Sequence, residues 1–111
     1  MDLDRRNQWL RGVLDLCVLA LLRGGESYGY ELAQRLEAKG IGPVQGGTLY
    51  PLLLRLQKTG LVVTRWQEGE AGLARKYYAI TAAGRDALHR EVHDWRLFAG
   101  LVGAVMEEGA R

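Results

Sequence analysis

Residues 45–62 read Gln45-Gly46-Gly47-Thr48-Leu49-Tyr50-Pro51-Leu52-Leu53-Leu54-Arg55-Leu56-Gln57-Lys58-Thr59-Gly60-Leu61-Val62, an order that predicts a short helix followed at once by a strand. Thr48 is the expected N-cap, because its hydroxyl can accept a hydrogen bond from a free amide of the first turn. Pro51 then falls in the first turn, where its missing N–H breaks no helical hydrogen bond. Gly60 is the expected end of the helix.

The predicted helix has two contrasting faces. One face is an apolar stripe that follows the i, i+3, i+4, i+7 rule and consists of Leu49, Leu52, Leu53 and Leu56. The side chains left away from this stripe are Tyr50, Pro51, Arg55 and Lys58. A rigid basic helix of this kind, braced by a β-hairpin, is what a protein inserts into a DNA major groove.

Two further helices are predicted ahead of this stretch. The first covers residues 8–23 and is stopped by Gly24-Gly25. The second covers residues 28–39, with Ser27 as its cap and Gly40 as its end. A glycine-rich turn then leads into the basic helix. Helix, short turn and helix form a helix-turn-helix arrangement.

A β-hairpin is predicted directly after the basic helix. Residues 61–66 and 75–80 are rich in β-branched and aromatic residues, and the connection 67–74 contains Gly69 and Gly72. A helix-turn-helix followed by such a hairpin is a winged helix. Of the hairpin aromatics, Tyr77, Tyr78 and Trp66 are expected to pack the wing against the core rather than to stack on bases.

The last predicted helix covers about residues 82–108 and is capped by Thr81. Its heptad positions are spaced 4, 3, 4, 3 and 4 residues apart and are Leu88, Val92, Trp95, Ala99, Val102 and Met106. A second apolar stripe at Phe98, Leu101 and Val105 widens this face. Because so broad a face lacks an obvious cover within the chain, we expect a second subunit to bury it.

The expected fold class is therefore mainly α with a β-hairpin. Residues 1–80 form a winged helix-turn-helix DNA-binding domain, whose N-terminal helix also joins the dimer interface. Residues 81–111 form a long C-terminal dimerisation helix.

Composition supports one folded domain with an uneven charge. The 111 residues carry a net charge of +2, but residues 35–76 hold seven Lys/Arg against three Asp/Glu. The positive charge therefore lies where the basic helix and the hairpin are predicted, and a polyanion is a plausible partner.

The single cysteine excludes an intrachain disulfide. Cys17 lies in the apolar run 16–22 and is expected to be a small buried hydrophobe, with a redox sensor as the alternative. The run does not resemble a signal peptide and is far below the roughly 20 residues that span a membrane. We expect no membrane association and a cytoplasmic location.

Several short motifs follow one another along most of the chain: Leu10-Arg11-Gly12, Ser27-Tyr28-Gly29-Tyr30-Glu31-Leu32, Gly47-Thr48-Leu49-Tyr50-Pro51-Leu52-Leu53, Arg55-Leu56, Gly60-Leu61, Trp66, Arg75-Lys76-Tyr77-Tyr78 and Thr81-Ala82-Ala83-Gly84-Arg85. Together they resemble one known family, the PadR-type transcriptional regulators. The single C-terminal helix is similar to the small PadR subfamily. That resemblance implies a dimeric winged-helix repressor of transcription, and some such proteins bind flat hydrophobic compounds between the subunits.

The chain departs from the family pattern in two loops. Glu26 stands where proline is frequent, and Leu73-Ala74 precedes Arg75 where paired prolines are common. The second departure could alter the rigidity of the wing.

The residues expected to contact DNA are Gln45, Thr48, Tyr50, Pro51, Arg55, Lys58, Arg75 and Lys76. Tyr50 and Arg55 could instead only solubilise a helix face, and Arg55 could grip either a guanine edge or a phosphate. Arg75 and Lys76 are expected to clamp phosphates, the alternative being an ordinary charged strand start. The expected partner is double-stranded DNA with a pseudo-palindromic operator.

The resemblance also implies a small hydrophobic or planar aromatic effector at the dimer interface. The residues expected to bind it are Gly12, Asp15, Leu16, Val92, Trp95, Phe98 and Ala99. Trp95 could stack on the ligand, anchor the dimer core, or do both. Asp15 interrupts an apolar helix and could attract a cationic compound, or it could be a solvated carboxylate.

No catalytic constellation is present in the sequence, and we expect neither an enzyme nor a cofactor. His89 and His93 are spaced i, i+4, but the glutamate between them is not in the zincin position and no third ligand is near, so no metal site is expected. The function expected is a DNA-binding repressor released by its effector. The alternative is a winged-helix protein-interaction module, against which the basic residues Arg55, Lys58, Arg75 and Lys76 count.

Overall fold

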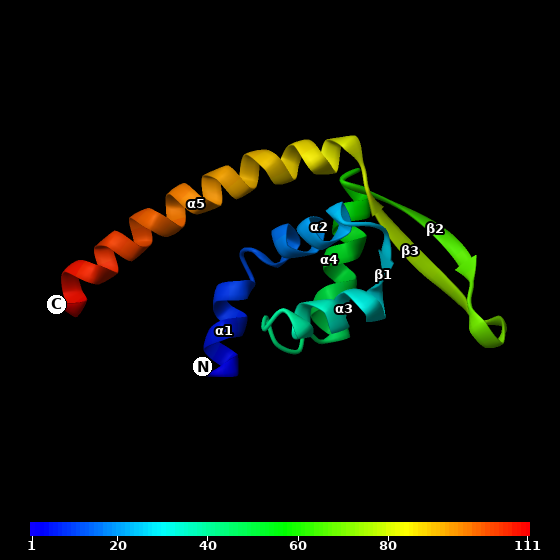
Figure 1. The fold of residues 1–111 in the computed structure, drawn as a ribbon, viewed down its shortest axis with the longest axis horizontal. Coiled ribbons are helices and arrows are strands. Elements are labelled where there is room, and N and C mark those ends of the chain that lie inside the picture. Colours follow the sequence, from blue (N-terminus) through cyan, green and yellow to red (C-terminus); the bar gives the residue numbers. More distant parts are fainter.

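The computed structural model describes residues 1–111 and confirms a winged helix-turn-helix with a long C-terminal helix. Figure 1 shows a small helical body, the wing at one side of it, and the last helix arching away. In chain order the elements are α1 (Leu3–Leu10), α2 (Leu14–Arg23), β1 (Ser27–Tyr28), α3 (Gly29–Ala38), α4 (Gly46–Lys58), β2 (Val62–Glu68), the 3₁₀ turn η1 (Glu70–Gly72), β3 (Ala74–Ile80) and α5 (Ala82–Ala110).

The single first helix predicted over residues 8–23 is wrong, because the chain forms two helices there. A turn at residues 11–13 separates α1 from α2, and Val13 has φ −130° and ψ 1°, which is not helical. Gly12 lies in this turn, and glycine weakens a helix interior. The helix α1 also begins earlier than predicted, because the side chain of Asp2 caps it by accepting from the backbone N–H of Arg5 at 3.0 Å.

The expected caps of the helix-turn-helix pair need correction. Ser27 is not the cap of α3; it lies in β1, is fully buried, and its hydroxyl donates to Oε1 of Glu31 at 2.5 Å. Thr48 is not the cap of α4, which begins at Gly46 with Gln45 at the N-cap position, three residues earlier than predicted. Pro51 therefore lies inside the helix rather than in its first turn, and the carbonyl of Gly47 loses its helical donor.

The sheet has three antiparallel strands in the order β1-β3-β2. The β2–β3 hairpin is the predicted wing, with Val62 opposite Ile80 and Glu68 opposite Ala74. Its turn contains Ala71 at φ 61° and Gly72 at φ 76°, a left-handed pair that reverses the chain. The two-residue strand β1 was not predicted, because it is too short for an alternating pattern.

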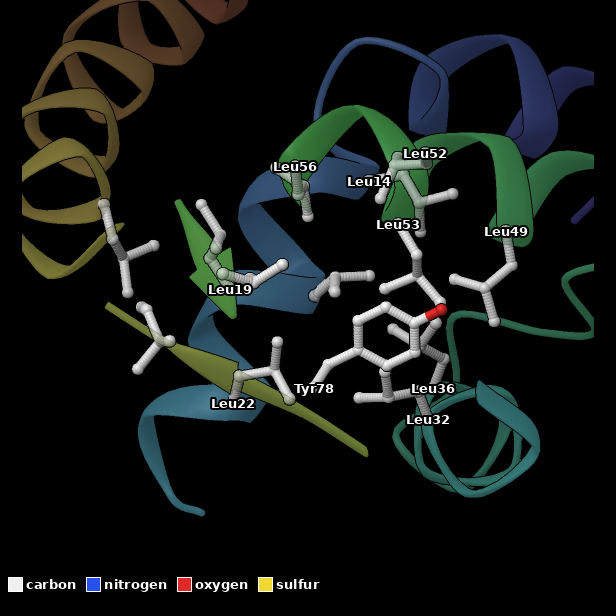
Figure 2. Packing of buried hydrophobic residues seen from close by; sticks show 14 of the residues in the cluster. Leu14, Leu19, Leu22, Leu32, Leu36, Leu49, Leu52, Leu53, Leu56 and Tyr78 are labelled. Carbon is white, nitrogen blue, oxygen red and sulfur yellow. The ribbon is translucent and has the colours of Figure 1, made fainter. Parts of the chain in front are cut away.

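The core is built from leucines of α2, α3 and α4 together with the inner face of β3. Figure 2 shows the ring of Tyr78 among these leucines, which converge from three helices. The predicted stripe of α4 is buried as expected, in full: Leu49, Leu52, Leu53 and Leu56. Burial of each such side chain contributes about 1.5–3 kcal/mol. The stripe therefore fixes how α4 sits on the body, and with it which face α4 presents to solvent.

The helix α5 is capped by Thr81, whose hydroxyl accepts from the backbone N–H of Gly84 at 3.0 Å, as predicted. Its first turns pack on α2 and β3, which buries Ala87 and Leu88. Figure 1 shows its C-terminal half extending beyond every other element. None of the helices is both long enough and apolar enough to cross a membrane.

Candidate nucleic-acid interface

The exposed side of α4 lies opposite its leucine stripe. At about 100° per residue, Gly47, Pro51 and Lys58 point away from the core, and all three are exposed. Leu54 belongs to the same side, is 47% exposed, and was not among the predicted contacts. Tyr50 and Arg55 lie on the two opposite edges of this side. The surface that α4 offers therefore has an apolar and cationic centre flanked by a tyrosine and an arginine.

The Tyr50 edge of α4 rests on α3. A methyl group at Gly29 would lie 2.5 Å from Cε1 of Tyr50, so the tyrosine ring occupies the space that a side chain at Gly29 would need. Tyr50 is nevertheless 51% exposed. The ring is thus held in place by the first residue of α3 while part of it remains open to solvent.

The Arg55 edge of α4 faces α1. A cavity of ≈ 560 Å³ lies between these two helices, and Gln45, Thr48, Pro51 and Arg55 line it on the α4 side. Asn7 and Arg11 are among the residues on its other side. The predicted DNA contacts on α4 therefore lie in two places. Tyr50 lies next to α3, whereas Gln45, Thr48, Pro51 and Arg55 line the cavity between α4 and α1.

The two predicted phosphate clamps of the wing point to opposite faces of the sheet. Lys76 shares the inner face with Tyr78, is half-buried, and its ammonium donates to Oε1 of Gln57 on α4 at 3.1 Å. Gln57 also donates to the hydroxyl of Thr64 at 3.3 Å, so this α4 side chain joins both strands of the wing. Arg75 is exposed on the outer face. Lys76 therefore helps to fix the wing on α4, whereas Arg75 is open to solvent.

The outer face of the sheet carries two arginines stacked on two tyrosines. The guanidinium carbon of Arg75 lies 4.5 Å from the ring centroid of Tyr28, and that of Arg65 lies 5.0 Å from the centroid of Tyr77. The two tyrosine rings meet edge to face with centroids 5.4 Å apart. Tyr78 thus packs on the core as predicted, whereas the prediction is wrong for Tyr77, which packs on Tyr28 of β1 at the outer face.

The prediction that Trp66 packs the wing against the core is wrong, because 68% of its surface is exposed. It lies on the inner face of the sheet opposite Lys76, but beyond the reach of the helical core. Arg65 was not predicted as a site residue. Its ion-pair partner is Glu26, 39 residues away in sequence, and only the fold brings the two together.

A shallow groove of ≈ 330 Å³ lies between the α1–α2 turn and α5. It brings together five of the seven residues predicted to bind an effector: Gly12, Asp15, Leu16, Trp95 and Phe98. Its other lining residues are Val13, Glu91 and Asp94, which were not predicted. Val92 and Ala99 do not line it; Val92 packs against the core beside Leu88. The groove therefore combines two aromatic side chains with three carboxylates.

The predicted dimer face of α5 divides into two parts. Leu88 is only 8% exposed and belongs to the core of its own chain, so it leaves little surface for a partner. Further along, the helix exposes large apolar side chains over most of their surface: Leu97, Phe98, Leu101, Val105 and Met106. Val102 and Ala99 are half-buried. The open apolar surface thus begins near Trp95 and extends toward the C-terminus.

The chain is similar to known regulators over most of its length. The model of the Transcriptional regulator PadR-like family matches residues 18–90. Transcriptional regulator Rv3488 of Mycobacterium tuberculosis is 40% identical over 81 residues, which cover 73% of this chain and 74% of that protein.

Solved structures show the same fold. The PadR family transcriptional regulator from Eggerthella lenta matches with a TM-score of 0.82 and 37% identity, covering 90% of this chain and 87% of that one. Bacillus subtilis PadR in complex with operator DNA matches with a TM-score of 0.66 and 28% identity, covering 72% of this chain and 46% of that one. The chain therefore belongs to the PadR-like family of transcriptional regulators.

Proposed function

We propose that this chain is a homodimeric transcriptional repressor that binds two-fold symmetric duplex DNA through α4 and the β2–β3 wing. The observation that carries the proposal is the exposed side of α4, where Tyr50, Arg55 and Lys58 stand clear of the leucine core. The related Bacillus subtilis PadR has been crystallised with operator DNA, which supports the same partner here. Arg75 adds an open cation on the adjoining wing.

A gel-shift titration against the DNA that flanks the gene, repeated at rising salt, tests this function. Specific binding should weaken with salt, because each phosphate contact releases counterions. Arg75→Ala should weaken binding to the operator and to random duplex alike, whereas Tyr50→Ala and Arg55→Ala should weaken operator binding more. Failure to retard any duplex would instead favour a protein-interaction module.

The homodimer is proposed from the open apolar surface of α5. Leu101 and Val105 are 67% and 68% exposed, one turn of helix apart on the same side. Water contact with so continuous an apolar surface is unfavourable, and a symmetry-related copy of α5 offers a complementary cover. A two-fold dimer would also place two copies of α4 on one duplex.

The effector is proposed to be a planar aromatic cation bound in the groove beside Trp95. Trp95 is 43% exposed there and Phe98 offers a second ring, while Asp15, Glu91 and Asp94 supply negative charge. The groove lies where a second α5 would pack, so a ligand in it would change how the two subunits sit. Such a ligand favours one arrangement only by its differential affinity, commonly about 1–3 kcal/mol. Release of the operator would follow if the favoured arrangement separates the two copies of α4.

Quenching of tryptophan fluorescence by a flat cationic dye tests the effector site. Trp95→Ala should remove most of the quenching and leave the dimer folded. Trp9→Phe and Trp66→Phe are the matched controls, because both tryptophans are exposed and neither lines the groove. Unchanged dye affinity in Trp95→Ala would show that Trp95 serves packing alone.

A further inference from the structure

The three-stranded sheet carries two similar arginine–tyrosine units on its outer face, and only one of the two arginines is free of an ion pair. Arg75 lies over Tyr28 and Arg65 lies over Tyr77, with the two rings in edge-to-face contact. Stacking of this kind holds a guanidinium in one orientation and leaves its N–H edges available. Both arginines are exposed and lie on the same side of the sheet.

The N–H groups of Arg65 that could bind a phosphate already bind the carboxylate of Glu26. Its Nε donates to Oε2 of Glu26 at 2.9 Å, and its Nη2 forms a second bond with Oε1 of the same carboxylate. This two-point geometry is the one that a guanidinium uses to bind a phosphate. The bond from Arg65 also lowers the pKa of the Glu26 carboxyl.

Glu26 reaches Arg65 across the sheet. It precedes β1 at one edge of the sheet, whereas Arg65 lies on β2 at the other edge, with β3 between them. This contact is the single ion pair of the chain, and Arg75 has no acidic partner. The two arginine–tyrosine units therefore differ in one respect, which is the carboxylate that caps the first.

We propose that Glu26 acts as a built-in competitor for DNA phosphate at Arg65, so that the wing grips DNA with Arg75 while Arg65 is kept neutralised. This inference rests on the proposed DNA-binding function. A phosphate contact carries no sequence information, so masking Arg65 limits the affinity of the wing for duplexes of any sequence. Glu26 thereby sets the strength of non-specific binding without touching DNA.

Replacement of the competitor by its neutral isostere tests the proposal. Glu26→Gln should raise the affinity for a random-sequence duplex about three- to tenfold near physiological salt and steepen the log–log salt slope by about one per wing. The same gain should appear on operator DNA. Glu70→Gln is the matched control, because Glu70 is an exposed carboxylate in the turn of the same hairpin without an ion-pair partner. It removes the same charge and should leave the salt slope unchanged.

Arg65→Gln distinguishes a masked cation from one already on DNA. Arg65→Gln alone should change the affinity for DNA less than twofold, a change as small as the free energy that an exposed ion pair usually contributes. Combined with Glu26→Gln it should cancel the gain, and Arg75→Gln should weaken binding in every background.

The outcomes separate the two proposals. If the parent chain binds duplex DNA but Glu26→Gln behaves like Glu70→Gln, or Arg65→Gln costs as much as Arg75→Gln, the inference is overturned while DNA binding stands. If no variant binds duplex DNA, the proposed function fails and the inference falls with it.

Discussion

At the scale of single residues, Tyr50 shows how packing can prepare a side chain for recognition. Its ring lies in the space left by the missing side chain of Gly29, yet half of its surface stays open. A side chain fixed before binding loses less rotamer entropy when it contacts a partner. The glycine that opens α3 is therefore part of the α4 surface, although it contributes no side chain of its own.

Gly29→Ala should lower the free energy of unfolding by about 1 kcal/mol, because the new methyl group would overlap the half-exposed Tyr50 ring and push it toward solvent. Gly47→Ala is the matched control: its Cβ meets open space, and alanine is favoured over glycine in a helix by about 0.5–1 kcal/mol. Urea denaturation measures both changes. Tyr50→Ala should restore part of the stability of Gly29→Ala, and a Gly29→Ala variant as stable as its parent would contradict the packing described.

Cys17 should react slowly with alkylating reagents. Partial burial raises the pKa of its thiol, and the nearby Asp15 carboxylate raises it further, so little thiolate is present at pH 8. Reaction with iodoacetamide should be slower than for a free cysteine peptide, should accelerate as the pH rises toward the raised pKa, and should reach the peptide rate in denaturant. If the folded and the unfolded chain react with iodoacetamide at equal rates, the thiol of Cys17 is not protected by burial, and this explanation is wrong.

The pattern of residues along the sequence predicts which side chains are buried better than it predicts which side chains contact each other. The spacing of the α4 leucines identified the core correctly, since a helix repeats every 3.6 residues whatever surrounds it. Trp66 was assigned to packing on residue type alone, and its distance from the helical core leaves it exposed. The Glu26–Arg65 pair joins a loop residue to a residue of β2 that lies 39 positions away in sequence, so no local pattern could indicate it.

At the scale of elements, the wrong predictions have both local and long-range causes. Thr48 is a good cap by type, yet the carbonyl of Gln45 already accepts from the amides of Thr48 and Leu49, at 2.9 and 3.0 Å. The helix therefore starts at Gly46-Gly47 in spite of the low helix propensity of glycine. The strand β1 exists because β3 pairs with it, and a segment of two residues carries too little pattern to predict that pairing.

Pro51→Ala should stabilise the chain by about 1–3 kcal/mol, because alanine restores the helical hydrogen bond to the carbonyl of Gly47. Thermal unfolding measures the gain, with Leu54→Ala as a control at another exposed position of the same helix. A lower melting temperature for Pro51→Ala would mean that the proline ring contributes packing that outweighs the lost bond. Weaker operator binding by the stabilised variant would fit the expected DNA contact at Pro51.

At the scale of the whole molecule, the long axis of 58 Å arises because α5 extends beyond the helical body of the chain. The heptad pattern predicted a seam from Leu88 to Met106, but α2 covers its beginning, so the sequence could not tell intrachain from interchain burial there. No other element of the chain covers the C-terminal half of the helix (Figure 1). This open half of α5 is the surface from which the dimer is proposed.

Val102→Asp should convert the dimer into a folded monomer, because it would place an unpaired charge within the proposed seam. Val63→Asp is the control, since Val63 is an exposed valine on β2 and does not belong to the open half of α5. Sedimentation velocity reports the mass and circular dichroism reports the helix content. A Val102→Asp protein that stays dimeric would place the interface elsewhere.

Hydroxyl-radical footprinting on the DNA flanking the gene shows whether two copies of α4 bind one duplex. We expect two protected half-sites related by two-fold symmetry, with centres about one helical turn, or about 10 bp, apart or a multiple of it. The protection should weaken for Tyr50→Ala and should appear at a lower protein concentration for Glu26→Gln. A single protected site without symmetry, or no protection at concentrations that shift the band, would contradict it.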